Sequence, residues 1–171
     1  MLFSRALTSA SAGLLLSLID QVITSPTVAS PKAPKLQLLY RLNLTLGDAL
    51  SFGPGPKGTR LSFPITGGEF NGPKLSGRVL NVGADLGLVD DKGTFFANAY
   101  YQFQTEDGAN ILVHADGPGL QNGPHPVTRI TLETGSEGYY WLNNIVVVGE
   151  STPGDGFVAI NAWQVITPSA G

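Results

Sequence analysis

The chain has 171 residues, a formal net charge of -3, and only 13% charged residues. Soluble domains carry about 25%, and no cluster of Lys and Arg offers a surface for nucleic acid. The absence of Cys excludes disulfides, thiol nucleophiles and cysteine-based metal sites. With 22 Gly and 12 Pro among short runs of β-branched and aromatic residues, the composition favours an all-β domain.

The first 29 residues predict a secretory signal peptide. Arg5 precedes an apolar run that ends at Asp20, and small residues follow from Thr27 to Ser30. The apolar run is too short for a transmembrane helix, so we expect no integral membrane span. A mitochondrial presequence and a disordered leader on a cytoplasmic protein are the alternatives to secretion.

A linker and one domain follow this leader. Residues 30–35 include Pro31 and Pro34 and are typical of an extended linker, residues 36–166 form the domain, and residues 167–171 form a tail. The sequon Asn43-Leu44-Thr45 makes Asn43 a candidate glycosylation site, which agrees with secretion.

Alternating apolar residues between turn signals predict a set of strands and no interior helix. The expected strands cover residues 36–46, 59–66, the stretch up to 80, 94–105, 109–115, 127–133, 139–148 and 156–166. The Gly- and Pro-rich residues 52–58 predict a loop, and Gly67, Gly68, Gly72 and Pro73 predict a turn between two strands. A closed antiparallel β-barrel of about eight to ten strands would remove exposed sheet edges. Such a barrel has room for side chains or one small ligand. A two-sheet sandwich is the alternative.

Several motifs resemble one family across most of residues 36–166. They are Pro64-Ile-Thr-Gly-Gly-x-Phe-x-Gly-Pro-x-Leu-x-Gly-x-Val-Leu80, Gly83-Ala-Asp85, Thr105-x-Asp-Gly-Ala109, Tyr140-Trp-Leu-Asn143 and Val148-Gly149. The family is the one catalogued as domain of unknown function 3237, also called UPF0311. The resemblance implies a closed antiparallel barrel similar to those of lipocalins and allene oxide cyclase. It also implies a connection with secondary metabolism, since some fungal relatives perform isomerase or cyclase steps there.

The sequence departs from the family pattern at three positions. Leu86 stands where the family usually has Trp, and Asn98 and Tyr100 stand where it commonly has Asp and Arg. An activity that needs that acid and base would therefore be weakened here, and the resemblance implies a less polar pocket.

The strand at 94–105 presents two different faces. Its odd-numbered residues are apolar and predict packed core, whereas its even-numbered residues mix aromatic rings with amides. The even-numbered residues could line a cavity or face the solvent, and the alternation alone leaves both interpretations open. The family correspondence at Asn98 and Tyr100 favours the cavity, where these side chains would bind substrate.

Asp85 and His114 are the candidate catalytic residues. Inside an apolar barrel, desolvation would raise the pKa of Asp85 and suit it to acid–base catalysis; capping of a turn is the alternative. His114 could move a proton, or could be structural. His125, in the loop before residue 127, and Glu69 are weaker candidates.

Trp141 and Asn143 are further candidate substrate-binding residues. They share one face of the expected strand at 139–148, where an aromatic wall and an amide donor would hold a carbonyl-bearing ligand. Core packing for Trp141 and a hydrogen bond at a strand end for Asn143 are the alternatives.

These features predict a small-molecule-binding barrel that needs no cofactor. Two His without Cys predict no metal site, and no nucleophile elbow, phosphate loop or dinucleotide fingerprint occurs. We expect an isomerase or cyclase acting on an apolar carbonyl or phenolic metabolite. A secreted carrier without catalysis is the main alternative, and a filled structural barrel is a weaker one. Homo-oligomer formation is left open.

Overall fold

Ten strands and one 3-10 helix form residues 30–119 and 126–168, the part of the chain that the computed structural model describes. The elements are β1 (Lys35–Leu46), β2 (Leu50–Gly55), β3 (Gly58–Asn71), β4 (Ser76–Asp85), β5 (Leu88–Val89), β6 (Phe95–Thr105), β7 (Asn110–Pro118), β8 (Val127–Glu133), η1 (Glu137–Asn144), β9 (Val147–Pro153) and β10 (Phe157–Ile166). The predicted leader at 1–29, His125 and the last three residues of the tail lie outside the described residues.

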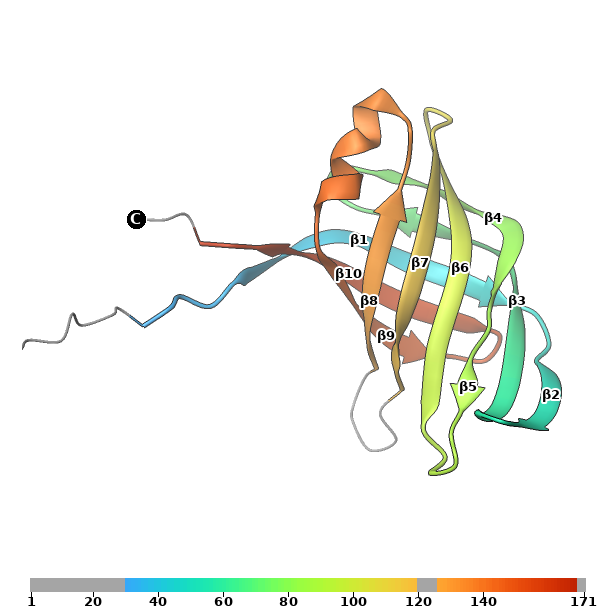
Figure 1. The fold of residues 1–171 in the computed structure, drawn as a ribbon. Helices are drawn as coiled ribbons and strands as arrows, with labels where there is room; N and C mark the ends of the chain where they lie inside the picture. The colour runs from blue at the N-terminus through green and yellow to red at the C-terminus, as the bar shows by residue number, and fades with distance from the viewer. Residues whose placement is uncertain (1–29, 120–125, 169–171) are drawn as a thin grey trace, which may run out of the picture. The chain divides into compact units, whose positions relative to one another are not determined.

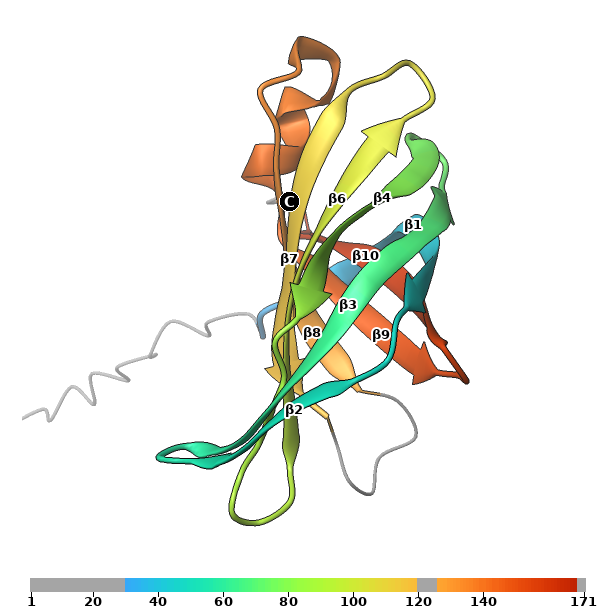
Figure 2. The same cartoon turned by 90° about the vertical axis from the view of Figure 1, so that its right-hand side faces the viewer.

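The sheet closes on itself because β1 pairs at both of its edges. Along the order β1-β10-β9-β8-β7-β6-β4-β3, each neighbour is antiparallel, and β1 also pairs with β3. Eight strands therefore form the barrel, while β2 pairs with β3 and the short β5 bridges β3 and β6 (Figures 1 and 2). The predicted closed antiparallel barrel is confirmed, and the two-sheet alternative is wrong.

Large side chains fill the half of the barrel nearest η1. Phe70 and Phe103 stack with ring centroids 3.9 Å apart, and Tyr40 meets Phe103 edge-on at 5.3 Å. Leu142 of η1 is also fully buried in this cluster. This packed half fixes the positions of the strands whose other ends surround a cavity.

The predicted turn is right at Gly72 and Pro73, which lie between β3 and β4, and wrong at Gly67 and Gly68, because β3 runs through both residues without reversing. A Cβ atom at Gly68 would lie 2.2 Å from the carbonyl oxygen of Asn43 in β1, and the φ angle there is 137°. Glycine is therefore needed for the close approach of two strands, and the chain reverses only around Pro73.

The expected loop at 52–58 and the expected strand at 139–148 are also wrong. Residues Leu50–Gly55 form β2, which tolerates Pro54 because it lies at the edge of the sheet. Residues Glu137–Asn144 form η1. Apolar side chains three residues apart, at 139, 142 and 145, pack on the core, which is the spacing of a 3-10 helix.

Among the residues described, no helix is long and apolar enough to cross a membrane. Asn43 is exposed on β1, at a position open to a glycan, and its glycosylation stays a prediction.

We expect Gly68→Ala to lower the free energy of unfolding by about 3 kcal/mol or more, because the added methyl group forces β1 and β3 apart. Urea unfolding followed by circular dichroism measures the change. Gly135→Ala is the control, since its Cβ would meet nothing within 4 Å; its effect should stay within about 0.5 kcal/mol. Equal stabilities of the two variants would contradict this account of closure.

Candidate functional site

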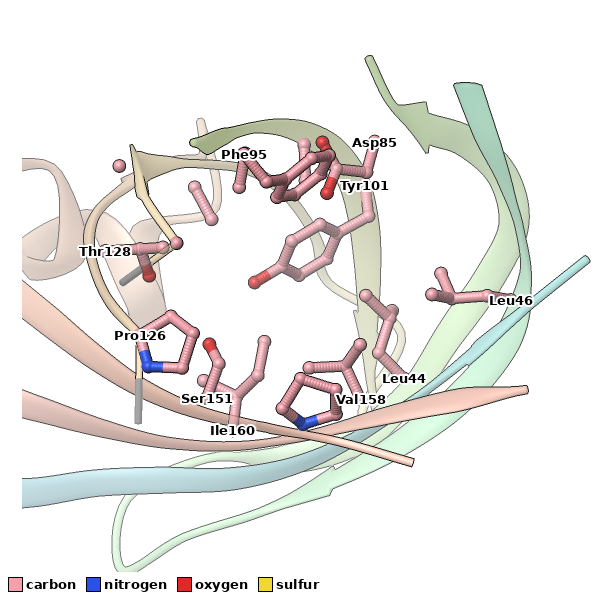
Figure 3. Close-up of a pocket in the computed structure, with 16 residues that line it drawn as sticks. Leu44, Leu46, Asp85, Phe95, Tyr101, Pro126, Thr128, Ser151, Val158 and Ile160 are labelled. Atoms are coloured by element: carbon pink, nitrogen blue, oxygen red, sulfur yellow. The ribbon is translucent and has the colours of Figure 1, made fainter. Parts of the chain in front are cut away.

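A cavity of about 130 Å³ occupies the end of the barrel away from η1. It lies between the first residues of β6, β8 and β10 and the last residues of β1, β4, β7 and β9 (Figure 3). The lining residues are Leu44, Leu46, Asp85, Phe95, Ala97, Ala99, Tyr101, Ala115, Gly117, Gly119, Pro126, Thr128, Ser151, Pro153, Val158 and Ile160. Most of this wall is apolar, which is typical of a site for a small organic molecule.

The cavity exists because small residues face one another across β6 and β7. Ala97 pairs with Gly117, and Ala99 pairs with Ala115. Two positions further along, the pairs become Tyr101 with Val113 and then Phe103 with Ile111, and the interior is filled. The change in side-chain volume along one pair of strands therefore divides the barrel into a hollow half and a packed half.

Four side chains bring polar atoms to this apolar space. Ser151 and Tyr101 point inward from opposite sides, and Asp85 lies in the wall on the side of Tyr101 (Figure 3), but the oxygens of Tyr101 and Thr128 are themselves buried from water. Asp85 carries the only carboxyl group among the lining residues. A site with one acid in an apolar wall can transfer a proton to or from a bound molecule.

The backbone of β6 holds Asp85 at the last position of β4. Its Oδ1 atom accepts a hydrogen bond from the backbone N–H of Asn98 at 2.8 Å. Burial raises the pKa of Asp85 above the ordinary value of 3.8, and the hydrogen bond from Asn98 opposes part of that rise. The cavity therefore favours the neutral, proton-donating form of this carboxyl group more than water does.

Asn98, Tyr100 and His114 come together on the outer face of the barrel. The Nε2 atom of His114 lies 2.8 Å from Oδ1 of Asn98, and its ring stacks on Tyr100 with centroids 4.1 Å apart. The prediction that the even-numbered face of this strand lines the cavity is wrong, because alternation turns Ala99 and Tyr101 inward instead. The sequence does contain the signal that was missed, namely small residues at matching positions of two neighbouring strands.

Trp141 and Asn143 lie on η1 and do not reach the cavity. The side chain of Asn143 accepts a hydrogen bond from the Thr134 backbone N–H at 3.0 Å and donates to the Thr134 carbonyl oxygen at 2.9 Å. Trp141 is half-buried beneath the ammonium group of Lys74, 5.2 Å from the ring centroid. These contacts fit the structural alternatives for both residues. Glu69 is exposed and does not line the cavity either.

The charged groups of the described chain do not form a cation site. No three His, Asp or Glu side chains in residues 30–119 and 126–168 lie close enough together to hold a metal ion. Asp116 and Arg129, which pair across β7 and β8, are joined by a salt bridge on the outer surface.

A closed antiparallel barrel with one apolar cavity is the architecture of a class of small-molecule-binding proteins. The model of the family described as "Protein of unknown function (DUF3237)" matches residues 34–165, and the chain belongs to this family. The resemblance inferred from the sequence motifs is therefore confirmed.

Two curated relatives show how far the similarity extends. A hydroalkoxylation enzyme of Penicillium herquei is 33% identical over 135 residues, which cover 79% of this chain and 86% of the relative. A UPF0311 protein of Rhodopseudomonas palustris is 33% identical over 153 residues, covering 78% of this chain and 99% of the relative.

Solved structures share the same fold. A β-barrel-like protein from Acinetobacter baumannii has a TM-score of 0.74 and 29% identity, covering 80% of this chain and 99% of that one. An enzyme from Penicillium herquei has a TM-score of 0.64 and 34% identity, covering 79% of this chain and 96% of that one. A solved structure with this fold is thus named as an enzyme.

The raised pKa of Asp85 predicts a pH-dependent stability. Between the ordinary pKa and the raised one, the folded chain binds more protons than the unfolded chain. The free energy of unfolding therefore falls as the pH rises through this interval and then levels off. Because Asp85→Asn removes this titration, we expect its stability relative to the unsubstituted chain to improve across the same interval. Urea unfolding at a series of pH values measures both profiles.

Asp116→Asn is the control, because it removes a carboxyl group that pairs with Arg129 outside the barrel. Parallel pH profiles for Asp85→Asn and the unsubstituted chain would contradict the assignment of a raised pKa to Asp85.

Proposed function

We propose that the chain is an isomerase of the cyclase type that works by acid–base catalysis without a cofactor, with Asp85 as the proton donor and acceptor. The observation that carries this proposal is the position of Asp85, a single carboxyl group in the wall of an otherwise largely apolar cavity. Its raised pKa supports the role, because burial makes this carboxyl group bind its proton more tightly than a carboxyl group in water does.

The name of the Penicillium herquei relative supports a finer assignment to hydroalkoxylation. Hydroalkoxylation adds an alcohol or phenol O–H bond across a C=C double bond, and within one molecule it produces a cyclic ether of unchanged composition. A cavity that excludes water suits this reaction, because water would otherwise compete with the substrate oxygen for the activated carbon.

In the proposed reaction, Asp85 donates its proton to one carbon of the double bond, and positive charge develops on the other carbon. The hydroxyl oxygen of the substrate bonds to that second carbon, and its proton passes back to Asp85. One C–H bond and one C–O bond form while the alkene π bond and one O–H bond break. No electrons are gained or lost overall, so the step needs neither an oxidant nor a reductant.

The departures of this chain from the family pattern do not count against catalysis. Asn98 and Tyr100 replace the acid and the base of related sequences, but both side chains lie on the outer face and not in the cavity. The substitutions therefore remove no charge from the cavity, and they do not weaken an activity that depends on Asp85.

The test is to incubate the chain with a small-molecule extract of its source organism in H₂O and in D₂O. We expect one compound to disappear and a product of equal mass and different retention to form in H₂O. In D₂O the product should carry one carbon-bound deuterium, as measured by mass spectrometry. Asp85→Asn should lower this turnover by about 100-fold or more.

His114→Ala is the matched control, because His114 is a half-buried ionisable residue on the outer face. It should retain most of the turnover. A compound that the protein retains without converting would identify a carrier. Equal activity of Asp85→Asn and the unsubstituted chain would contradict the role given to Asp85.

A further inference from the structure

Ser151 carries the one hydroxyl group among the described lining residues that a ligand can reach. The oxygens of Tyr101 and Thr128 are buried from water. The oxygen of Ser151 instead points into the open space, from the side of the cavity opposite Tyr101 (Figure 3). Apart from Asp85, the other lining residues are apolar or glycine. Ser151 and Asp85 are therefore the two side chains that can make a polar contact with a bound molecule.

The Ser151 hydroxyl group has no partner in the part of the chain that the structure describes. The residue is only 8% exposed, and its side chain makes no hydrogen bond to another described residue. The large majority of buried polar side chains have a hydrogen-bond partner. An unpaired hydroxyl group that faces a cavity therefore indicates that a ligand supplies the partner.

The backbone of β9 holds Ser151 in a fixed position. The N–H of Ser151 donates a hydrogen bond to the carbonyl oxygen of Pro126 at 2.9 Å, and β9 pairs Ser151 with Ile160 of β10 on its other side. Because β9 is paired along both edges, only rotation about the Cα–Cβ bond moves the hydroxyl oxygen. Such a group can hold one end of a ligand in a defined place.

We propose that Ser151 is a positioning residue, which binds an uncharged hydroxyl or keto oxygen of the substrate and thereby directs the reacting double bond toward Asp85 on the other side of the cavity. This inference rests on the proposed function, because it names the substrate class of the same site. A serine hydroxyl group can donate a hydrogen bond to a keto oxygen and can also accept one from a hydroxyl group.

The oxygen that Ser151 binds is distinct from the oxygen that adds to the double bond. In the proposed reaction, the adding hydroxyl group returns its proton to Asp85, so it lies on the side of Asp85. Ser151 lies on the opposite side. The substrate is therefore an unsaturated alcohol or phenol that carries a second oxygen, at the end away from the double bond.

The cavity selects an uncharged ligand. None of the described lining residues is Lys, Arg or His, so a carboxylate or phosphate group would enter without a positive partner, which is strongly unfavourable. When ionised, Asp85 would also repel an anion. A hydroxyl or keto oxygen carries no charge and avoids both costs.

The size of the cavity sets how much of the substrate enters. A cavity of about 150 Å³ lined by apolar residues holds one benzene molecule, and the volume here is about 130 Å³. Ala97, Ala99 and Ala115 provide a wall without bulky side chains, against which a flat ring can lie. A larger substrate therefore inserts one ring, and the remainder stays toward the open end.

Phenol and toluene test the role of Ser151, because they share one ring and differ only in a hydroxyl or a methyl group. Binding is measured by isothermal titration calorimetry on the full chain. Ser151→Ala should lower the ratio of phenol to toluene affinity by about 3- to 10-fold, since it removes a partner of the phenol oxygen only. Ser151→Thr retains the hydroxyl group and should keep the ratio within about 2-fold, although its added methyl group weakens the binding of both probes.

Ser62→Ala is the matched control. Ser62 lies on β3 and is also 8% exposed, but it does not line the cavity. The same change of side chain at this position should leave the affinity ratio unaltered. Thermal unfolding of each variant verifies that it is folded.

Three results would overturn the role of Ser151. They are an unchanged affinity ratio in folded Ser151→Ala, an equal loss in Ser62→Ala, and no binding of either probe at millimolar concentration. Neither probe contains an alkene, so this experiment does not depend on turnover. A lowered ratio in Ser151→Ala together with full activity of Asp85→Asn would support the role of Ser151 and reject the proposed function. An unchanged ratio together with an inactive Asp85→Asn would do the opposite.

Discussion

The pairing of β1 with β3 closes the sheet, and the cavity depends on that closure. β1 contributes Leu44 and Leu46 to the cavity wall, while β3 holds the last residue of β4 through its pairing with Asp85. The two strands approach closely at Gly68, where no side chain would fit. If the pairing of β1 with β3 were broken, water would reach the carboxyl group of Asp85, and the desolvation that raises its pKa would be lost.

A second constraint is the division of the barrel into a packed half and a hollow half. Aromatic rings such as Phe70 and Phe103 fill one half, so the strands are held rigidly without help from a ligand. The other half can then be lined by alanine and glycine without collapsing. Tyr101 lies where the two halves meet, and Asp85 lies in the wall of the hollow half, opposite Ala99 of β6. Such pre-organisation is what an acid–base site without a cofactor requires.

Much of the fold could be predicted from the sequence, because strand alternation and turn residues are local signals. Asp85 was also identifiable, since it follows two small residues at the end of a strand motif. The lining residues Tyr101, Thr128 and Ser151 were not identified. An apolar strand face looks the same in sequence whether it packs against other side chains or borders a cavity. The distinction depends on which residues face each other across strands, as Ala97 and Gly117 do, and that register is a tertiary property.

The segment that forms η1 shows a second limit on what can be predicted from the sequence. Residues 139–145 fit both a two-residue alternation, which groups Trp141 with Asn143, and a three-residue spacing, which groups Tyr139 with Leu142. Burial of Leu142 against the packed half decides between them. Likewise, Asn98, Tyr100 and His114 were correctly placed on neighbouring strands, but which face of the barrel they occupy follows only from closure.

The most direct test of the account is an NMR titration of the side-chain carboxyl carbon of Asp85 in ¹³C-labelled protein. The signal is assigned by its absence in Asp85→Asn. The account predicts that this carbon titrates above the ordinary value of 3.8, as expected for a desolvated acid in the cavity. Titration at or below that value would show that Asp85 is solvated and ionised, and would contradict its role as the proton donor.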